Sequence, residues 1–138
     1  MHIKIILEQP RGFYSIKHIE PLEALLLSEF LTVDVGSRAS WFLEWFKNPE
    51  NSAGSGNATD YEIDEGIMTI IPEWQPDYDE CIRKGNYFSI RFDLVLELLR
   101  QWGPVYNAQP PYIIITIIDD VVEVRGSNTY EEDTATRS

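Results

Sequence analysis

The sequence predicts a single α+β domain, built mainly from antiparallel β-sheet with two or three helices packed on it. The first observation is that most runs of β-branched residues are joined by tight turns, which favours antiparallel pairing over a doubly wound parallel sheet. The second is the helical spacing of large apolar residues between these runs. The third is size: 138 residues, 43% of them apolar, can form one core without a disulfide or a metal.

The first half of the chain predicts two strands, two helices and a loop. Apolar β-branched residues indicate a buried strand over 3–7 and a second, shorter strand over 13–16. A leucine-rich stripe predicts a helix over 21–36, and a Trp- and Phe-rich stripe predicts another over 41–46. The Gly- and Ser-rich stretch 51–57 is expected to be a mobile loop.

The second half predicts three hairpins and one helix. Residues 61–71 form a hairpin with a glycine-assisted turn, and residues 81–90 form another around Lys84-Gly85-Asn86. The strongest apolar stripe predicts a helix over 94–102, closed by Gly103-Pro104. A last hairpin is expected over 113–125, with its first strand in the centre of a sheet.

The expected domain covers residues 1–126. Beyond it, residues 127–138 form a polar tail with one Tyr and no Leu, Ile, Val or Phe. Because this tail has little apolar surface to bury, we expect it to be flexible.

The charge balance excludes several classes of partner. Eleven Lys and Arg residues against 23 Asp and Glu residues give a net charge of -12. Binding to nucleic acid or to anionic lipid needs a basic face, so we expect neither partner. No apolar run approaches the length of a membrane helix, and Cys81 is the single cysteine. A cytoplasmic protein without a disulfide is therefore expected.

Groups for catalysis near neutral pH are scarce. The chain has two histidines, His2 and His18, and no Gly-x-Ser-x-Gly motif that would expose a nucleophile. Cys81 could pair with His18, but without a family signature a buried structural thiol is the better interpretation. We therefore predict no catalytic residues.

Metal and nucleotide motifs fail in detail. The run 60–66 alternates carboxylates like a calcium loop, but its glycine is one place late and Ile71 takes the position of the closing glutamate. A divalent cation at Asp77-Tyr78-Asp79 is a weaker interpretation than a solvated acidic turn. Gly54-Ser55-Gly56 lacks the third glycine of a dinucleotide fingerprint, since Thr59 stands there. No metal and no cofactor are predicted.

The most unusual feature is an acidic stretch between residues 60 and 80. It holds eight carboxylates and no Lys or Arg, with aromatic residues between them. General acidity for solubility is one explanation, and a docking face for a cationic partner is the other. For the docking face, the predicted partner-binding residues are Asp60, Glu62, Asp64, Glu65, Glu73, Trp74, Asp77, Tyr78, Asp79 and Glu80. The aromatic residues of 41–46 are interpreted as core.

In size, acidity and layout the chain resembles the immunity proteins of bacterial contact-dependent growth inhibition and related polymorphic toxin systems. The resemblance rests on the strand at 3–7, the helix Trp41-Phe42-Leu43-Glu44-Trp45-Phe46, the Gly56-Asn57 loop and the Asp119-Asp120 hairpin. It implies a small α+β protein that binds and neutralises a cognate basic toxin, often a nuclease. No functional residue is carried over by position.

Two other functions remain open. One is a different non-catalytic binding module, such as a nucleic-acid mimic or an adaptor subunit. The other is an enzyme that uses carboxylates, which a concave cluster of Glu73, Asp77, Asp79 and Glu80 would favour. A toxin gene directly upstream would favour the immunity protein.

Overall fold

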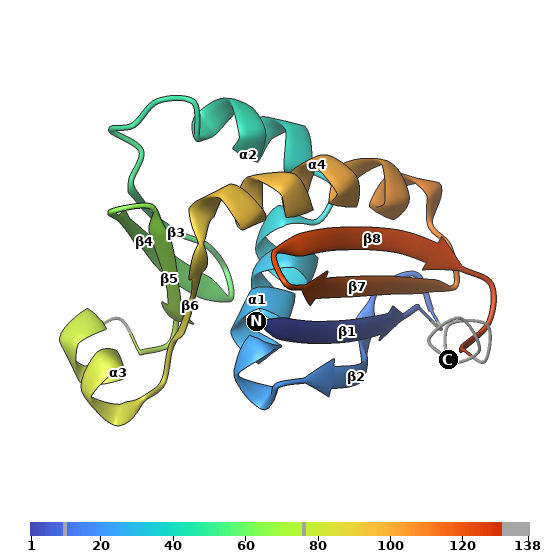
Figure 1. The fold of residues 1–138 in the computed structure, drawn as a ribbon, viewed down its shortest axis with the longest axis horizontal. Helices are drawn as coiled ribbons and strands as arrows, with labels where there is room; N and C mark the ends of the chain where they lie inside the picture. Colours follow the sequence, from blue (N-terminus) through green and yellow to red (C-terminus); the bar gives the residue numbers. More distant parts are fainter. Residues whose placement is uncertain (10, 76, 131–138) are drawn as a thin grey trace.

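Residues 1–9, 11–75 and 77–130 are described by the computed structural model shown in Figure 1. Four α-helices and two four-stranded antiparallel sheets make up this part of the chain. The α+β class and the antiparallel pairing are therefore confirmed, while the strands divide between two sheets.

The first sheet joins the two ends of the described chain. Its strand order is β2 (Ser15–Glu20), β1 (His2–Glu8), β7 (Tyr112–Ile118) and β8 (Val121–Ser127). The expected hairpin between β7 and β8 is confirmed, and both turn residues, Asp119 and Asp120, have positive φ angles of 51° and 67°. These values suit the tight turn that matches the twist of a hairpin. Strand β7 lies inside the sheet, as its continuous apolar run predicts.

The second sheet is contiguous in sequence except for one helix. It contains β3 (Ala53–Ser55), β4 (Thr59–Asp64), β5 (Ile67–Pro72) and β6 (Phe88–Arg91) in that order. The hairpin predicted over 61–71 is confirmed as β4 and β5, and its turn has positive φ at Glu65 and Gly66. Figure 1 shows this sheet to the side of the first, with helices above and below it.

Between β2 and β3 the chain is helical in three consecutive forms. A 3-10 turn, η1 (Leu22–Ala24), leads into α1 (Leu25–Glu29) and then into a π-helical segment, η2 (Phe30–Val35). Helix α2 (Ala39–Trp45) follows. The helices expected over 21–36 and 41–46 are therefore present, with a wider turn at the end of the first.

The longest helix, α4 (Phe92–Ala108), holds the layers together. It packs on β8 of the first sheet and against α2, and it continues directly from β6 of the second sheet. Figure 1 shows it lying along the first sheet with α2 beside it. The indole Nε1 of its fully buried Trp102 donates a hydrogen bond to the carbonyl oxygen of Gly36 at 2.9 Å. Helix α4 is thereby tied to the end of η2.

The hairpin expected over 81–90 is wrong, because 78–84 form helix α3 (Tyr78–Lys84). Asp77 caps this helix by accepting a hydrogen bond from the backbone N–H of Glu80, and Gly85 closes it with a φ of 74°. An acidic cap, acids in the first turn, bases in the last turn and a closing glycine are the usual signals of a helix. These signals outweigh the short apolar run that suggested a strand.

The expected helix end at Gly103-Pro104 is also wrong, since α4 continues to Ala108. Proline removes one helical hydrogen bond, but packing beyond it holds the next turn. The ring of Tyr106 stacks on Trp102 at 5.3 Å and contacts Tyr14 at 5.6 Å. The helix ends at Ala108, and the residue that caps it, Gln109, has a left-handed φ of 53°.

Two further boundaries differ from expectation. The strand expected over 13–16 lies at β2, later in the chain, while Phe13 is exposed and Tyr14 is buried with its hydroxyl donating to the carbonyl of Pro110. The stretch expected to be a mobile loop contains strand β3. Local composition is overridden in both places by contacts with distant residues.

The last described residues belong to the folded part. Strand β8 includes Ser127, which is buried, and the ring of Tyr130 lies 6.3 Å from that of Tyr112. The rest of the predicted tail, residues 131–138, lies outside the described residues.

Leu98 in the middle of α4 is fully buried, so its truncation should leave a cavity. We expect Leu98→Ala to lower the free energy of unfolding by about 2–5 kcal/mol, measured by urea denaturation. The matched control is Leu22→Ala, at a leucine that is 73% exposed in η1 and should change stability little. Equal effects of the two substitutions would contradict the position of α4 in the core.

Candidate functional site

Three of the predicted partner-binding residues form a row on β4. Along this strand Thr59 and Tyr61 are buried, whereas Asp60, Glu62 and Asp64 alternate with them and project from the opposite face. Alternate residues of a strand lie about 6.6–6.8 Å apart, so the three carboxylates form a regular line. In the part of the chain that the structure describes, none of the three forms a salt bridge.

Part of this row lines a groove. Asp60, Glu62 and Tyr78 share a concavity of about 330 Å³ with β3 and Ile71. The Oδ1 atom of Asp60 is buried and accepts no hydrogen bond from the described residues. A buried acceptor without a donor is costly, and a carboxylate oxygen more so. The Asp60 carboxylate at the groove therefore has one oxygen that is enclosed and that no described residue satisfies.

The other predicted partner-binding residues do not line this groove. Glu65 lies in the turn after β4, and Asp77 is used as the cap of α3. Glu80 forms ion pairs with Arg83 and Lys84 on the same helix, so the acidic stretch is partly neutralised by bases just beyond it. Glu73, Trp74 and Asp79 complete the set. Glu73 and Trp74 follow β5, while Asp79 lies in the first turn of α3.

Trp74 is separated from the groove. It is 73% exposed and lines a different cavity with Leu22, Leu26 and Tyr87. The structure therefore brings Asp60, Glu62 and Tyr78 together and places Trp74 on another surface.

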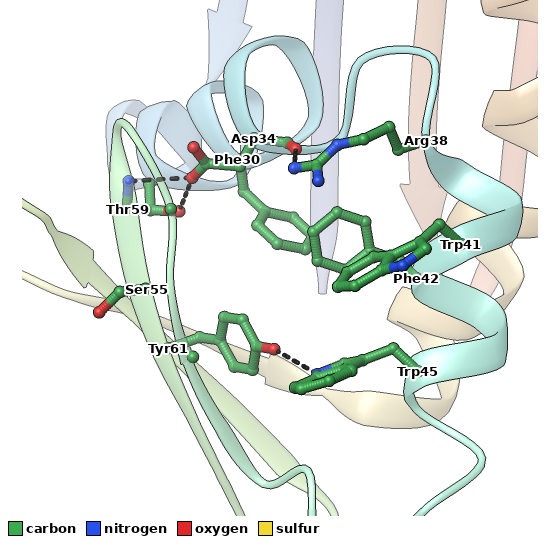
Figure 2. Close-up of a pocket in the computed structure, with 11 residues that line it drawn as sticks. Phe30, Asp34, Arg38, Trp41, Phe42, Trp45, Ser55, Thr59 and Tyr61 are labelled. Carbon is green, nitrogen blue, oxygen red and sulfur yellow. Dashed lines mark hydrogen bonds between the residues drawn. The ribbon is translucent and has the colours of Figure 1, made fainter.

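A second cavity, which no sequence pattern predicts, lies between α2 and the β3–β4 hairpin. We call it the aromatic pocket. Its volume is about 240 Å³, and Figure 2 shows the rings of α2 facing the hairpin across it. The pocket is lined by Phe30, Asp34, Arg38, Trp41, Phe42, Trp45, Gly54, Ser55, Gly56, Thr59 and Tyr61.

The aromatic residues of α2 divide between core and pocket. Phe42 and Phe46 are buried, as their interpretation as core requires. Trp41, however, is 48% exposed and its ring stacks on that of Trp45 at 5.2 Å, with the planes 15° apart. The Trp41 and Trp45 rings follow one another at helical spacing on the side of α2 that faces the hairpin.

One end of the aromatic pocket is fixed by a buried carboxylate. Asp34 in η2 is 3% exposed. Its oxygens accept hydrogen bonds from the backbone N–H groups of Asn57, Ala58 and Thr59 at 2.6, 3.0 and 2.9 Å, and from the Thr59 hydroxyl. Figure 2 shows the two bonds from Thr59. Four charge-assisted bonds satisfy this carboxylate and hold the β3–β4 turn against η2.

Two glycines allow the hairpin to come this close. A Cβ atom at Gly56 would lie 2.3 Å from the carboxyl carbon of Asp34, and one at Gly54 would lie 2.5 Å from the Tyr61 hydroxyl. The Gly-Ser-Gly stretch is therefore explained by close packing. Gly54, Ser55 and Tyr61 also line the acidic groove, so β3 is the wall between the two concavities.

The polar groups of the pocket lie at its two ends. The Arg38 guanidinium donates to the backbone carbonyl of Asp34 at 2.7 Å and lies 5.3 Å from the ring centres of both Trp41 and Phe42. At the other end the Trp45 indole N–H donates to the Tyr61 hydroxyl at 3.1 Å. Burial raises the pKa of Tyr61, against the opposing effect of this hydrogen bond, so its hydroxyl is neutral at physiological pH.

The two candidate catalytic groups of the sequence, His18 and Cys81, lie on different elements of the fold. His18 Nε2 is 3.5 Å from Glu20 in the first sheet, whereas Cys81 is fully buried in α3 beside the second sheet. Within the described residues no three His, Cys, Asp or Glu side chains are placed to hold a metal ion. Nor does any helix in the described part combine the length and apolarity needed to cross a membrane.

Comparison of the chain with family models, with curated proteins and with solved structures gave no match.

The Asp34 carboxylate should be a large contributor to stability. In Asp34→Asn the amide nitrogen faces a backbone donor, so at least one buried N–H loses its acceptor. We expect the free energy of unfolding to fall by about 2–3 kcal/mol in urea denaturation. Asp64→Asn is the matched control, because Asp64 is exposed on β4. A loss below 0.5 kcal/mol, on the order of a surface substitution, would contradict the role assigned to Asp34.

Cys81 should react slowly in the folded protein. Its side chain is fully buried, and burial together with the charges of Asp77 and Glu80 raises the pKa of the thiol. Because the thiolate is the nucleophile, modification by iodoacetamide at pH 8 should be at least about 100-fold slower in buffer than in denaturing urea. Mass spectrometry measures both rates, and similar rates would show that Cys81 is accessible.

Proposed function

We propose that this protein is a non-catalytic inhibitor that binds a cognate basic protein through the β4 carboxylate row and the adjoining groove. In the version that the sequence resemblance favours, it is an immunity protein and its partner is a toxin domain of the nuclease type. The observation that carries the proposal is the line of three carboxylates, Asp60, Glu62 and Asp64, on one face of β4 with no ion pair among the described residues.

The charges of this row favour a cationic partner. Three carboxylates in line repel one another, and Lys or Arg side chains of a partner would relieve that repulsion. The Oδ1 of Asp60 is enclosed and lacks a donor within the described chain, so the Asp60 carboxylate would gain by turning outward to a guanidinium or ammonium group of the partner. Exposed carboxylates around it would steer the encounter and raise the association rate.

The inhibition would be steric and electrostatic. A nuclease binds its substrate phosphates with basic side chains. A row of carboxylates on a rigid strand can occupy the same basic side chains and exclude nucleic acid. No group of this protein needs to react in this mechanism.

The first test identifies the partner. The tagged protein is purified from its native host, and the experiment asks for a stoichiometric basic protein. That partner is then expressed alone and together with this chain. Growth arrest by the partner alone, relieved by the chain in equal amount, is the expected result. A partner that causes no arrest, or an arrest that the chain does not relieve, would contradict an immunity function.

The second test removes the carboxylate row without changing its shape. In the triple variant Asp60→Asn, Glu62→Gln and Asp64→Asn, the association rate constant should fall about tenfold at low ionic strength. The difference from the wild type should fade as salt is raised, because rim charges are screened. Surface plasmon resonance over a salt series measures both effects.

The matched control carries the same change of three charges elsewhere. It neutralises three exposed glutamates on other elements, Glu23, Glu44 and Glu123, as glutamines. This control should bind as the wild type does. If the two triple variants lose equal affinity, net charge rather than the β4 row governs binding and the proposed face is wrong.

A further inference from the structure

We propose that the aromatic pocket is the anchor site for one uncharged aromatic side chain of the partner. This inference rests on the proposed function and deepens it, because it assigns the chemistry of the partner's central contact. The pocket and the acidic groove share Gly54, Ser55 and Tyr61 as a common wall. A partner that covers Asp60 and Glu62 therefore has the pocket within reach across β3.

The volume of the pocket fits one ring. An apolar cavity of about 150 Å³ takes up benzene. The 240 Å³ of this pocket leaves room for a ring with one polar substituent. Its walls are aromatic on the side of α2, as Figure 2 shows, so a planar guest can stack on or meet edge-to-face the rings of Trp41 and Trp45.

The charges around the pocket select against ionised guests. Arg38 lies over Trp41 and Phe42, so a second cation there would be repelled. Among the described residues that line the pocket, Asp34 is the single carboxylate, and it is buried and satisfied by four hydrogen bonds. An anionic guest would have to approach a chain of net charge -12 past the carboxylates across β3, and the Arg38 guanidinium already donates to the Asp34 carbonyl. An uncharged ring is the guest that remains.

A polar group of the pocket can receive the substituent of such a ring. The Tyr61 hydroxyl accepts the Trp45 N–H, and none of the described residues accepts the proton of that hydroxyl. The Ser55 hydroxyl points away from the rings, to the face of its register partner Asp60, so the Tyr61 hydroxyl is the group that meets the substituent (Figure 2). Tyrosine and tryptophan combine a ring with one polar group, and both are enriched among the residues that dominate binding energy at interfaces.

The test uses the protein alone and needs no identified partner. N-acetyl-L-tyrosinamide is titrated into ¹⁵N-labelled protein, and the four Trp indole N–H signals are followed by NMR. Saturable shifts are expected at Trp41 and Trp45, whereas Trp74, which lies in another cavity, should stay unchanged. N-acetyl-L-argininamide should bind at least about fivefold more weakly, because Arg38 opposes it.

Two variants separate the pocket from nonspecific stacking on tryptophan. Trp41→Ala should weaken binding of the tyrosine probe at least about fivefold, while the control Trp74→Ala, at another exposed tryptophan, should change it less than about twofold. Arg38→Gln should narrow the preference for the tyrosine probe over the arginine probe. Circular dichroism checks that each variant is folded. If Trp41→Ala does not fold, the wild-type titrations with the two probes test the anchor site on their own.

Several results would overturn the anchor site. They are shifts at Trp74 as large as those at Trp41, no saturation at Trp41 and Trp45, or tighter binding of the arginine probe. Such a failure is distinct from failure of the proposed function, because the charge-neutralising variants of β4 test the partner and leave the pocket intact. Conversely, unchanged binding of the tyrosine probe to those variants would still support the anchor site, even if the acidic row were not the interface.

Discussion

The Asp34 carboxylate is the interaction on which both concavities depend. It lies in the π-helical segment η2 and binds three consecutive backbone N–H groups of the β3–β4 turn. Without it, the hydrogen bond between Trp45 and Tyr61 would still join the far end of the hairpin to α2, but the N–H groups of the β3–β4 turn would lose the acceptor that holds them against η2. Because the bonds run to backbone rather than to side chains, the position of the turn is set with little dependence on the residues at 57 and 58.

The same constraint explains why the two candidate sites are neighbours. Holding the turn against η2 places β3 beside α2 on one side and leaves the β4 carboxylates on the other. Strand β3 is short, yet it borders the aromatic pocket on one side and the acidic groove on the other. Gly54 and Gly56 are needed there because a side chain at either position would displace Tyr61 or Asp34. The geometry of the pocket and that of the acidic groove are therefore set together.

Sequence patterns predicted the parts of this fold that depend on local chemistry. The hairpins at Glu65-Gly66 and Asp119-Asp120 follow from turn residues that tolerate positive φ, and α4 follows from its apolar stripe. Helix α3 was missed although Asp77 and Gly85 carry its cap signals, because the acids were weighed as charge and not as caps. The division into two sheets and the length of α4 depend on contacts between distant segments, which no local pattern contains.

The candidate site also has parts that local sequence patterns predict and parts that only the fold brings together. The carboxylates of β4 are predicted from sequence because eight acids without Lys or Arg between residues 60 and 80 form a local pattern. The same pattern includes Glu80, although bases one turn later pair with it. The aromatic pocket was not found, because its walls come from η2, α2, β3 and β4, and only the fold brings them together. Trp41 also has the helical spacing of a core residue, and spacing alone cannot distinguish a ring that is buried from one at a rim. Solubility explains an acidic surface, but it does not explain an exposed tryptophan stacked on a second one. The two features together therefore support the proposed interface more than either feature does alone.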